Sequence, residues 1–162
     1  MLRDVIKQLI VLNQNHIPFP LKERDDRLPL HSGRIITIPG VRRCGKSCKM
    51  KIAINELVDS GVSPQNILWI GFDDERLADM QAQDLNEVLE AYRELYPATP
   101  LSEVYMFFDE IQNIDGWELF VIRVFKNYCA NIFISGSNAT RCSAKRSRRL
   151  CGVGRWSTRR IR

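Results

Sequence analysis

One short segment constrains the fold of this chain more than any other feature. It places two glycines five residues apart and follows the second with a lysine and a serine: Gly40-Val41-Arg42-Arg43-Cys44-Gly45-Lys46-Ser47. The segment fits the pattern G-x-x-x-x-G-K-[ST] at every position, follows the apolar run 34–38 and opens a helix-compatible stretch. Glycines permit backbone conformations that other residues avoid, so successive N–H groups can turn inward around a polyphosphate. The sequence therefore predicts a strand, a phosphate-binding loop and a helix, in that order.

The loop also supplies side chains for nucleotide binding. Lys46 would place a point charge between the β- and γ-phosphates, and the Ser47 hydroxyl could ligate Mg²⁺. Arg42 and Arg43 could reach phosphates or a neighbouring subunit. Cys44 is either an oxidation-sensitive switch or, as we favour, a tolerated residue in a loop that binds through its backbone. The full set of expected nucleotide contacts is Gly40, Val41, Arg42, Arg43, Cys44, Gly45, Lys46, Ser47 and Cys48.

A second candidate segment is an apolar strand, residues 104–108, that ends in the two carboxylates of Asp109 and Glu110. Asp109 can hold Mg²⁺ through water, and Glu110 can polarise an attacking water. Buried acids are costly unless a cation or hydrogen-bond donors satisfy them, so their position hints at a metal. The alternative, two solvated acids at the start of a loop, is disfavoured by the phosphate-binding loop upstream. Because the chain has no N-K-x-D motif, we expect ATP rather than GTP.

Two further polar clusters follow predicted strands. Ser137 and Asn138 come after the run 131–135 and could touch the γ-phosphate or the attacking water. We prefer Asn138, although both residues could simply terminate the strand. In contrast, the acidic residues 73–75 are expected to cap a helix and face solvent rather than bind a ligand.

Apolar runs alternate with amphipathic stretches along the chain. The predicted strands are 34–39, 66–72, 104–108 and 131–135, and the predicted helices are 1–13, 46–60, 83–96 and 117–128. This alternation predicts an α/β fold, a three-layer αβα sandwich around a parallel sheet. We divide the chain into an N-terminal helix and connector (1–33), a core (34–140) and a tail (141–162) that we expect to be disordered.

The tail concentrates the positive charge of the chain. Residues 141–162 carry nine Arg or Lys and no acidic residue, whereas the net charge of the whole chain is +5. Clustered Lys and Arg bind nucleic-acid phosphates non-specifically, so a nucleic-acid-binding module is the alternative to an ATPase. Trp156 is the only aromatic residue of the tail, which gives base stacking little support. A small-molecule kinase is disfavoured because Glu110 suits water activation.

Cysteines and hydropathy bear on the compartment. The chain has five cysteines without zinc-binding spacing and opens without a signal peptide, which favours a reduced, cytoplasmic setting. No apolar run approaches the ~18–20 residues of a membrane span, so we expect no membrane partner.

Four segments together resemble one family: GVRRCGKS, WIGFDDERL, FFDEIQNIDGWE and IFISGSN. The chain resembles prokaryotic P-loop ATPases of the AAA type that carry a C-terminal domain of unknown function with nuclease-like character, and the resemblance covers roughly residues 30–140. It implies ATP hydrolysis in the intact parent, Mg²⁺ as cofactor and homo-oligomers. It also implies the ATPase roles given above to Lys46, Ser47, Asp109, Glu110 and Asn138. Pro39 and Cys48 depart from the family pattern, and Cys48 replaces a hydroxyl that would contact the α-phosphate.

The resemblance stops after residue 140. Codons can be chosen for residues 142–158 that, read one base earlier, encode a Leu-Arg-Gly-Arg continuation typical of the family. We therefore expect a frameshift, which makes the tail an out-of-frame product and removes the last core strand. The strand 34–39 would then lie at an unpaired sheet edge, a position prone to aggregation. From this we expect bound nucleotide but weak or absent turnover.

Overall fold

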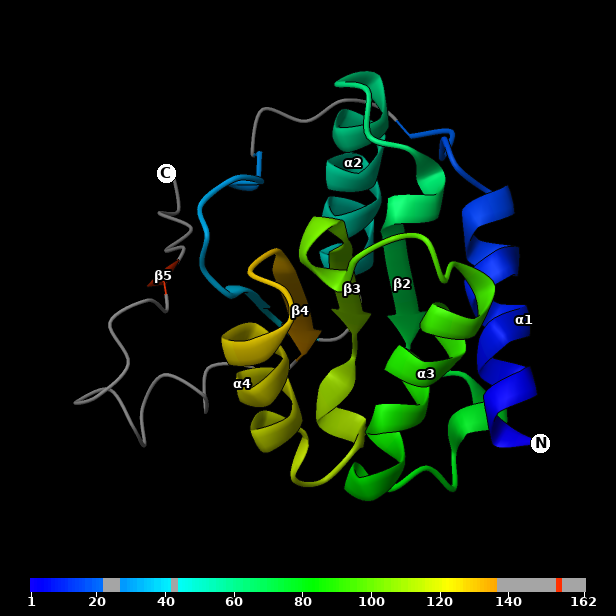
Figure 1. Cartoon of the computed structure of the whole chain (residues 1–162). Helices are drawn as coiled ribbons and strands as arrows, with labels where there is room; N and C mark the ends of the chain where they lie inside the picture. The colour runs from blue at the N-terminus through cyan, green and yellow to red at the C-terminus, as the bar shows by residue number, and fades with distance from the viewer. Residues whose placement is uncertain (22–26, 42–43, 137–153, 156–162) are drawn as a thin grey trace.

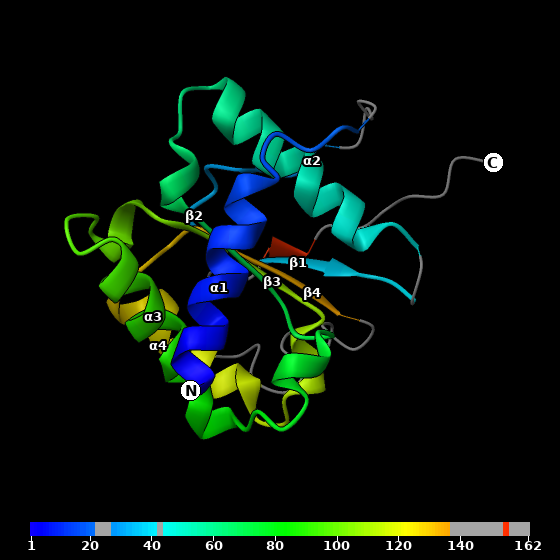
Figure 2. The same cartoon turned by 90° about the vertical axis from the view of Figure 1, so that its right-hand side faces the viewer.

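A parallel sheet forms the centre of the molecule. The computed structural model describes residues 1–21, 27–41, 44–136 and 154–155. The strands are β1 (Ile36–Pro39), β2 (Ile67–Gly71), β3 (Tyr105–Asp109), β4 (Ile132–Gly136) and β5 (Gly154–Arg155), in the order β2-β3-β4-β1-β5. Each described pairing is parallel, so the carboxyl ends of β1, β3 and β4 lie at the same end of the sheet (Figure 2).

Helices cover both faces of the sheet (Figure 2). One face packs against α1 (Leu2–Asn15), α3 (Asn86–Leu95) and α4 (Trp117–Asn127), and the other packs against α2 (Lys46–Asp59). Neighbouring residues of β3 serve opposite faces, because Phe108 belongs to the first cluster and Phe107 to the second. Phe107 stacks on Phe133 of β4 with ring centroids 4.6 Å apart. The predicted three-layer αβα sandwich is confirmed.

The described elements match the predicted ones closely, with one helix divided. The segment 83–96, predicted as one helix, is divided between the 3-10 turn η3 (Ala82–Leu85) and α3. The other short turns are η1 (Pro64–Asn66), η2 (Glu75–Leu77), η4 (Leu101–Glu103) and η5 (Ile111–Asn113). No helix in the described part of the chain is long and apolar enough to cross a membrane.

The edge beside β1 differs from the expectation of an unpaired strand. The two-residue strand β5 pairs with it, Gly154 opposite Ile36 and Arg155 opposite Thr37. Strand pairing uses backbone groups and makes little demand on side chains, so a segment without an apolar pattern can supply it. The rest of the tail, 141–153 and 156–162, lies outside the described residues.

The opposite edge, β2, is covered by α1 (Figure 1). Asn13 donates to the Trp69 carbonyl at 2.8 Å, and Gln14 donates to the Ile67 carbonyl at 2.9 Å. These side chains satisfy acceptors that an edge strand would otherwise present to other chains. At the other end of α1, Arg3 forms ion pairs with Glu87 and Glu94 of the α3 helix at 2.6 and 2.7 Å.

Candidate functional site

The predicted phosphate-binding loop connects β1 to α2. Gly45 precedes the first turn of α2 with φ at 86°, a left-handed conformation that glycine adopts without steric cost. The helix begins at Lys46, and the first N–H groups of a helix have no intrahelical partners. These N–H groups are therefore available to bind an anion at the loop. The described part of the loop therefore lies between a strand and the start of a helix, as the sequence pattern predicts.

Lys46 is buried and its ammonium is fully engaged. Only 4% of the residue is exposed, and Nζ donates to the carbonyls of Gly40 and Val41, each at 3.0 Å. A third partner is Glu110, whose Oε1 lies 3.2 Å from Nζ. An ammonium has three N–H donors, so these three acceptors use its whole capacity. A phosphate group can reach Lys46 only by exchanging with at least one of them.

The two carboxylates at the end of β3 have different surroundings. Asp109 is 4% exposed, and its Oδ1 accepts a hydrogen bond from the hydroxyl of Ser135. The same hydroxyl accepts the backbone N–H of Glu110 at 3.2 Å. Glu110 itself has φ at 51°, a left-handed conformation that non-glycine residues seldom adopt. This turn separates the two side chains, so that Asp109 faces Ser135 and Glu110 faces Lys46.

Ser135 is a site residue that the sequence pattern does not single out. It lies on β4, which stands between β1 and β3 in the sheet, and it is completely buried. The predicted strand ends at 135, which directs attention to the polar residues after it, whereas β4 continues to Gly136. The preferred candidate, Asn138, and its alternative Ser137 lie outside the described residues.

Gln112 is a second such residue. Its Nε2 donates to Oε2 of Glu110, while its Oε1 is buried and has no hydrogen-bond partner in the described structure. The residue lies in η5, directly after the left-handed turn at Glu110. Glu110 is therefore held from two sides, by an ammonium on one oxygen and an amide on the other.

The remaining predicted residues divide into three groups. Val41 and Cys44 are exposed, and Ser47 and Cys48 are half-buried in the first turn of α2. Arg42 and Arg43 lie outside the described residues.

The acidic stretch after β2 behaves as a cap. Asp74 accepts the backbone N–H of Arg76 at 3.0 Å and pairs with its guanidinium at 2.8 Å. The hydrogen bond from Arg76 lowers the pKa of this carboxyl below its usual range. The predicted cap is confirmed at Asp74.

A magnesium ion would fit this donor set only together with a nucleotide. Within the described residues, no group of three His, Cys, Asp or Glu side chains could enclose a metal. Asp109 retains acceptor capacity beyond its bond to Ser135, since a carboxylate has about four lone-pair sites. With Ser47, it offers the few oxygen ligands that Mg²⁺ takes from protein when phosphates and water supply the rest.

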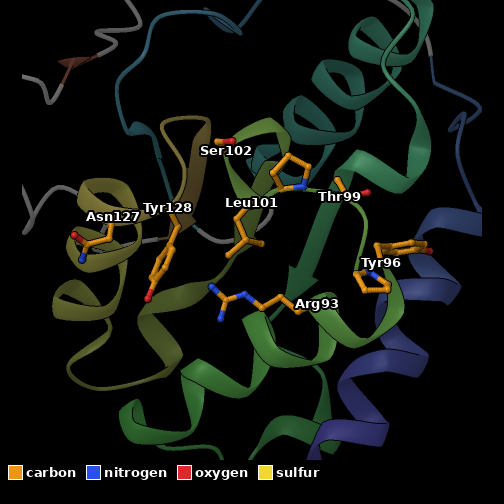
Figure 3. A pocket seen from close by; sticks show the side chains of 9 residues that line it. Arg93, Tyr96, Thr99, Leu101, Ser102, Asn127 and Tyr128 are labelled. Atoms are coloured by element: carbon orange, nitrogen blue, oxygen red, sulfur yellow. The ribbon is translucent and has the colours of Figure 1, made fainter.

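A cavity of about 510 Å³ lies away from these residues (Figure 3). It is lined by the last turns of α3 and α4 and by five of the residues 97–102, which precede β3. Helices that follow parallel strands return to the amino ends of the strands, so this cavity lies opposite the loop. Among its lining residues, Arg93 has its guanidinium carbon Cζ 5.2 Å from the ring centroid of Tyr128 and its Nη1 2.9 Å from Oε1 of Glu90. The cavity is not part of the candidate nucleotide site.

Comparisons with known proteins place the chain in a family. The profile of a family described as an AAA domain matches residues 32–161, a longer segment than the 30–140 of the resemblance. The chain is 34% identical over 139 residues to an uncharacterized protein of Methanocaldococcus jannaschii, and the match covers 85% of this chain and 29% of that protein. It is 32% identical over 118 residues to an uncharacterized protein of Haemophilus influenzae, covering 73% of this chain and 29% of that one.

The chain thus spans less than a third of the length of these relatives. Neither match supports the nuclease-like C-terminal domain, which stays a prediction. No solved structure matches the chain significantly. With the P-loop-type sheet and loop described above, the match over residues 32–161 shows that the chain belongs to the AAA domain family.

Proposed function

We propose that this chain binds ATP with Mg²⁺ and carries the residues for its hydrolysis to ADP and phosphate. The observation that supports this most is the 3.2 Å contact between Lys46 of the loop and Glu110 after β3. The ammonium of Lys46 can bind a phosphate, and the carboxylate of Glu110 can activate a water molecule. The two groups thus meet at the carboxyl ends of the strands.

The residues have separate roles in this proposal. Lys46 exchanges its present acceptors for phosphate oxygens, and the N–H groups of the loop bind the remaining oxygens. Ser47 and Asp109 would hold Mg²⁺, which neutralises phosphate charge when bound. Glu110, released from Lys46, accepts a proton from the attacking water.

We expect turnover by this chain to be slow. In the part of the chain that the structure describes, β5 pairs with the strand that leads into the loop at Ile36 and Thr37 alone. A loop on a partly supported edge strand samples more conformations, and small misplacements of reacting groups cost large factors in rate. A hydrolysis rate below about 1 s⁻¹, the lower end of ordinary enzymes, is the expected result.

The nucleic-acid alternative depends on residues 141–162. Only residues 154–155 of that segment are described, and their described contacts are with β1. No observation therefore favours this alternative over nucleotide binding.

Isothermal titration of the full chain with Mg²⁺–ATP tests the proposal. Lys46→Ala should raise the Kd about 10- to 100-fold, because hydrogen bonds to charged groups contribute a free energy of about that size. The matched control is Lys126→Ala, an exposed lysine at the end of α4. Circular dichroism shows whether Lys46→Ala is folded. Binding that is absent in the wild-type chain, or equal in both variants, refutes the proposal.

A further inference from the structure

Gln112 makes contacts that packing alone does not require. Its amide nitrogen donates to Glu110 Oε2, and its Oε1 is buried without a hydrogen-bond partner in the described structure. Buried polar atoms are nearly always hydrogen-bonded, so an unpaired acceptor calls for an explanation such as a functional role. The buried amide of Gln112 therefore has one unpaired atom, and its other polar atom contacts the carboxylate of Glu110.

The last residue of β4 fixes the position of this amide. A Cβ at Gly136 would clash with Oε1 of Gln112 and would lie 2.9 Å from its Cδ, closer than atoms can approach. Gln112 therefore lies flat against the backbone of Gly136, in space that any other residue at 136 would fill. The backbone of Gly136 therefore restricts the amide on one side.

The orientation of the amide also follows from its neighbours. Exchanging its oxygen and nitrogen would put an acceptor against the carboxylate of Glu110, which offers no hydrogen when ionised. The donor must face Glu110. With Oε2 held by Gln112, Oε1 is the oxygen left for Lys46, at 3.2 Å.

We propose that Gln112 is a positioning residue for hydrolysis, which orients Glu110 so that Oε1 accepts the proton of the attacking water. This inference rests on the proposed function. In the step, the water oxygen bonds to the γ-phosphorus and the bond from that phosphorus to the bridging oxygen breaks. Its electron pair leaves with ADP. The water proton passes to Glu110 Oε1 and then to solvent. Gln112 touches neither substrate nor water and acts through Glu110.

The first test is spectroscopic and needs no turnover. The side-chain amide signals of Gln112, identified by their loss in Gln112→Met, should move in Glu110→Gln. They should not move in Glu103→Gln, which changes an exposed acid of η4. They should keep their hydrogen-bonded shift when Mg²⁺ and a non-hydrolysable ATP analogue are added. The proposal is overturned if the chemical shifts of these signals do not change in Glu110→Gln, or if they lose their hydrogen-bonded values when the analogue is added.

The second test separates positioning from binding. In single-turnover assays with protein in excess over ATP, Gln112→Met should react about 10- to 100-fold more slowly, the cost of a misplaced catalytic group. The Kd for the ATP analogue should stay within about threefold, because Gln112 does not contact phosphate. Gln8→Met, an exposed position on α1, is the matched control.

The outcomes distinguish the two proposals. If the wild-type chain binds no ATP, the proposed function fails. If ATP binds normally and Gln112→Met hydrolyses it at the wild-type rate, the proposed function stands and the role of Gln112 is wrong.

Discussion

The buried ammonium of Lys46 lies 3.2 Å from the carboxylate of Glu110, and the two groups form an ion pair. A nucleotide must displace at least one of the three acceptors of Lys46, and we expect it to displace Glu110, because the other two are carbonyls of the loop itself. The same exchange would free Glu110 for water. Nucleotide binding and the release of the base are therefore expected to be one event.

This competition predicts that Glu110→Gln binds ADP more tightly than the wild type. A neutral amide oxygen is a weaker acceptor for an ammonium than a carboxylate, so less is lost when phosphate displaces it. We expect the Kd for Mg²⁺–ADP to fall about 10-fold, which corresponds to about 1.4 kcal/mol. Isothermal titration with ADP measures this without interference from hydrolysis.

Glu103→Gln removes the same charge from an exposed position and serves as the control for the net-charge effect. Its Kd should stay at the wild-type value. Equal or weaker ADP binding by Glu110→Gln would show that the carboxylate does not compete for Lys46.

Ser135 provides a second prediction. Its hydroxyl donates to Asp109 and accepts from the backbone N–H of Glu110, and the residue is fully buried. Ser135→Ala leaves a buried carboxylate oxygen of Asp109 and the half-buried N–H of Glu110 short of a partner. The free energy of unfolding should fall by about 1–3 kcal/mol, the cost of an unmade buried hydrogen bond.

Urea unfolding of Ser135→Ala and of Ser102→Ala, an exposed serine in η4, gives the comparison. The control should unfold at the wild-type midpoint. A midpoint for Ser135→Ala that matches the control would mean that water replaces the hydroxyl and that Ser135 does not hold Asp109 in place.

Local chemistry explains what the sequence predicts well. The loop from Gly40 to Ser47 is a contiguous sequence pattern, and the strand ending at Asp109 is an apolar run followed by acids. Both halves of the candidate site can therefore be recognised without knowledge of the fold. The division of residues 82–95 into η3 and α3 is not predictable in this way. Leu85 lies where the two elements join, and its apolar side chain fits the spacing of a 3-10 helix as well as that of an α-helix.

The residues missed by the sequence depend on non-local geometry. Ser135 meets Asp109 because β4 lies between β3 and β1, and sheet order is set by packing of the whole domain. Gln112 reaches Glu110 because of the left-handed turn at Glu110 itself. The pairing of β5 with β1 uses backbone atoms that every residue has. None of these relationships leaves a periodic signal.

The cover over β2 gives a third prediction. Gln14 bonds the Ile67 carbonyl through Nε2, and its Oε1 accepts the hydroxyl of Tyr96. Gln14→Met removes both bonds while keeping the length of the side chain. We expect a loss of about 1–3 kcal/mol in unfolding free energy and more association in light scattering, because an edge carbonyl is exposed.

Gln8→Met, at an exposed position of the same helix, controls for the change in helix propensity and surface hydropathy. The proposed cover is wrong if the two variants unfold at the same urea concentration and scatter light equally.

The fourth prediction concerns pH and the ion pairs between α1 and α3. Hydrogen bonds from Arg3 lower the pKa of Glu87 below its ordinary 4.5, and Lys7 together with Arg3 lowers that of Glu94. A lowered folded-state pKa contributes stability above the ordinary pKa and loses it as the pH falls through the folded value. The wild-type Tm should therefore drop below about pH 4.5 more steeply than that of Arg3→Met, and the difference should shrink in high salt.

Arg123→Met is the control, because Arg123 donates to the neutral amide of Asn86 at 2.9 Å and not to a carboxylate. Its Tm should change with pH as the wild-type Tm does. Parallel Tm profiles for Arg3→Met and the wild type between pH 7 and pH 3 would contradict the prediction. They would mean that solvent screens these exposed pairs so well that folding leaves the acidity of Glu87 and Glu94 unchanged.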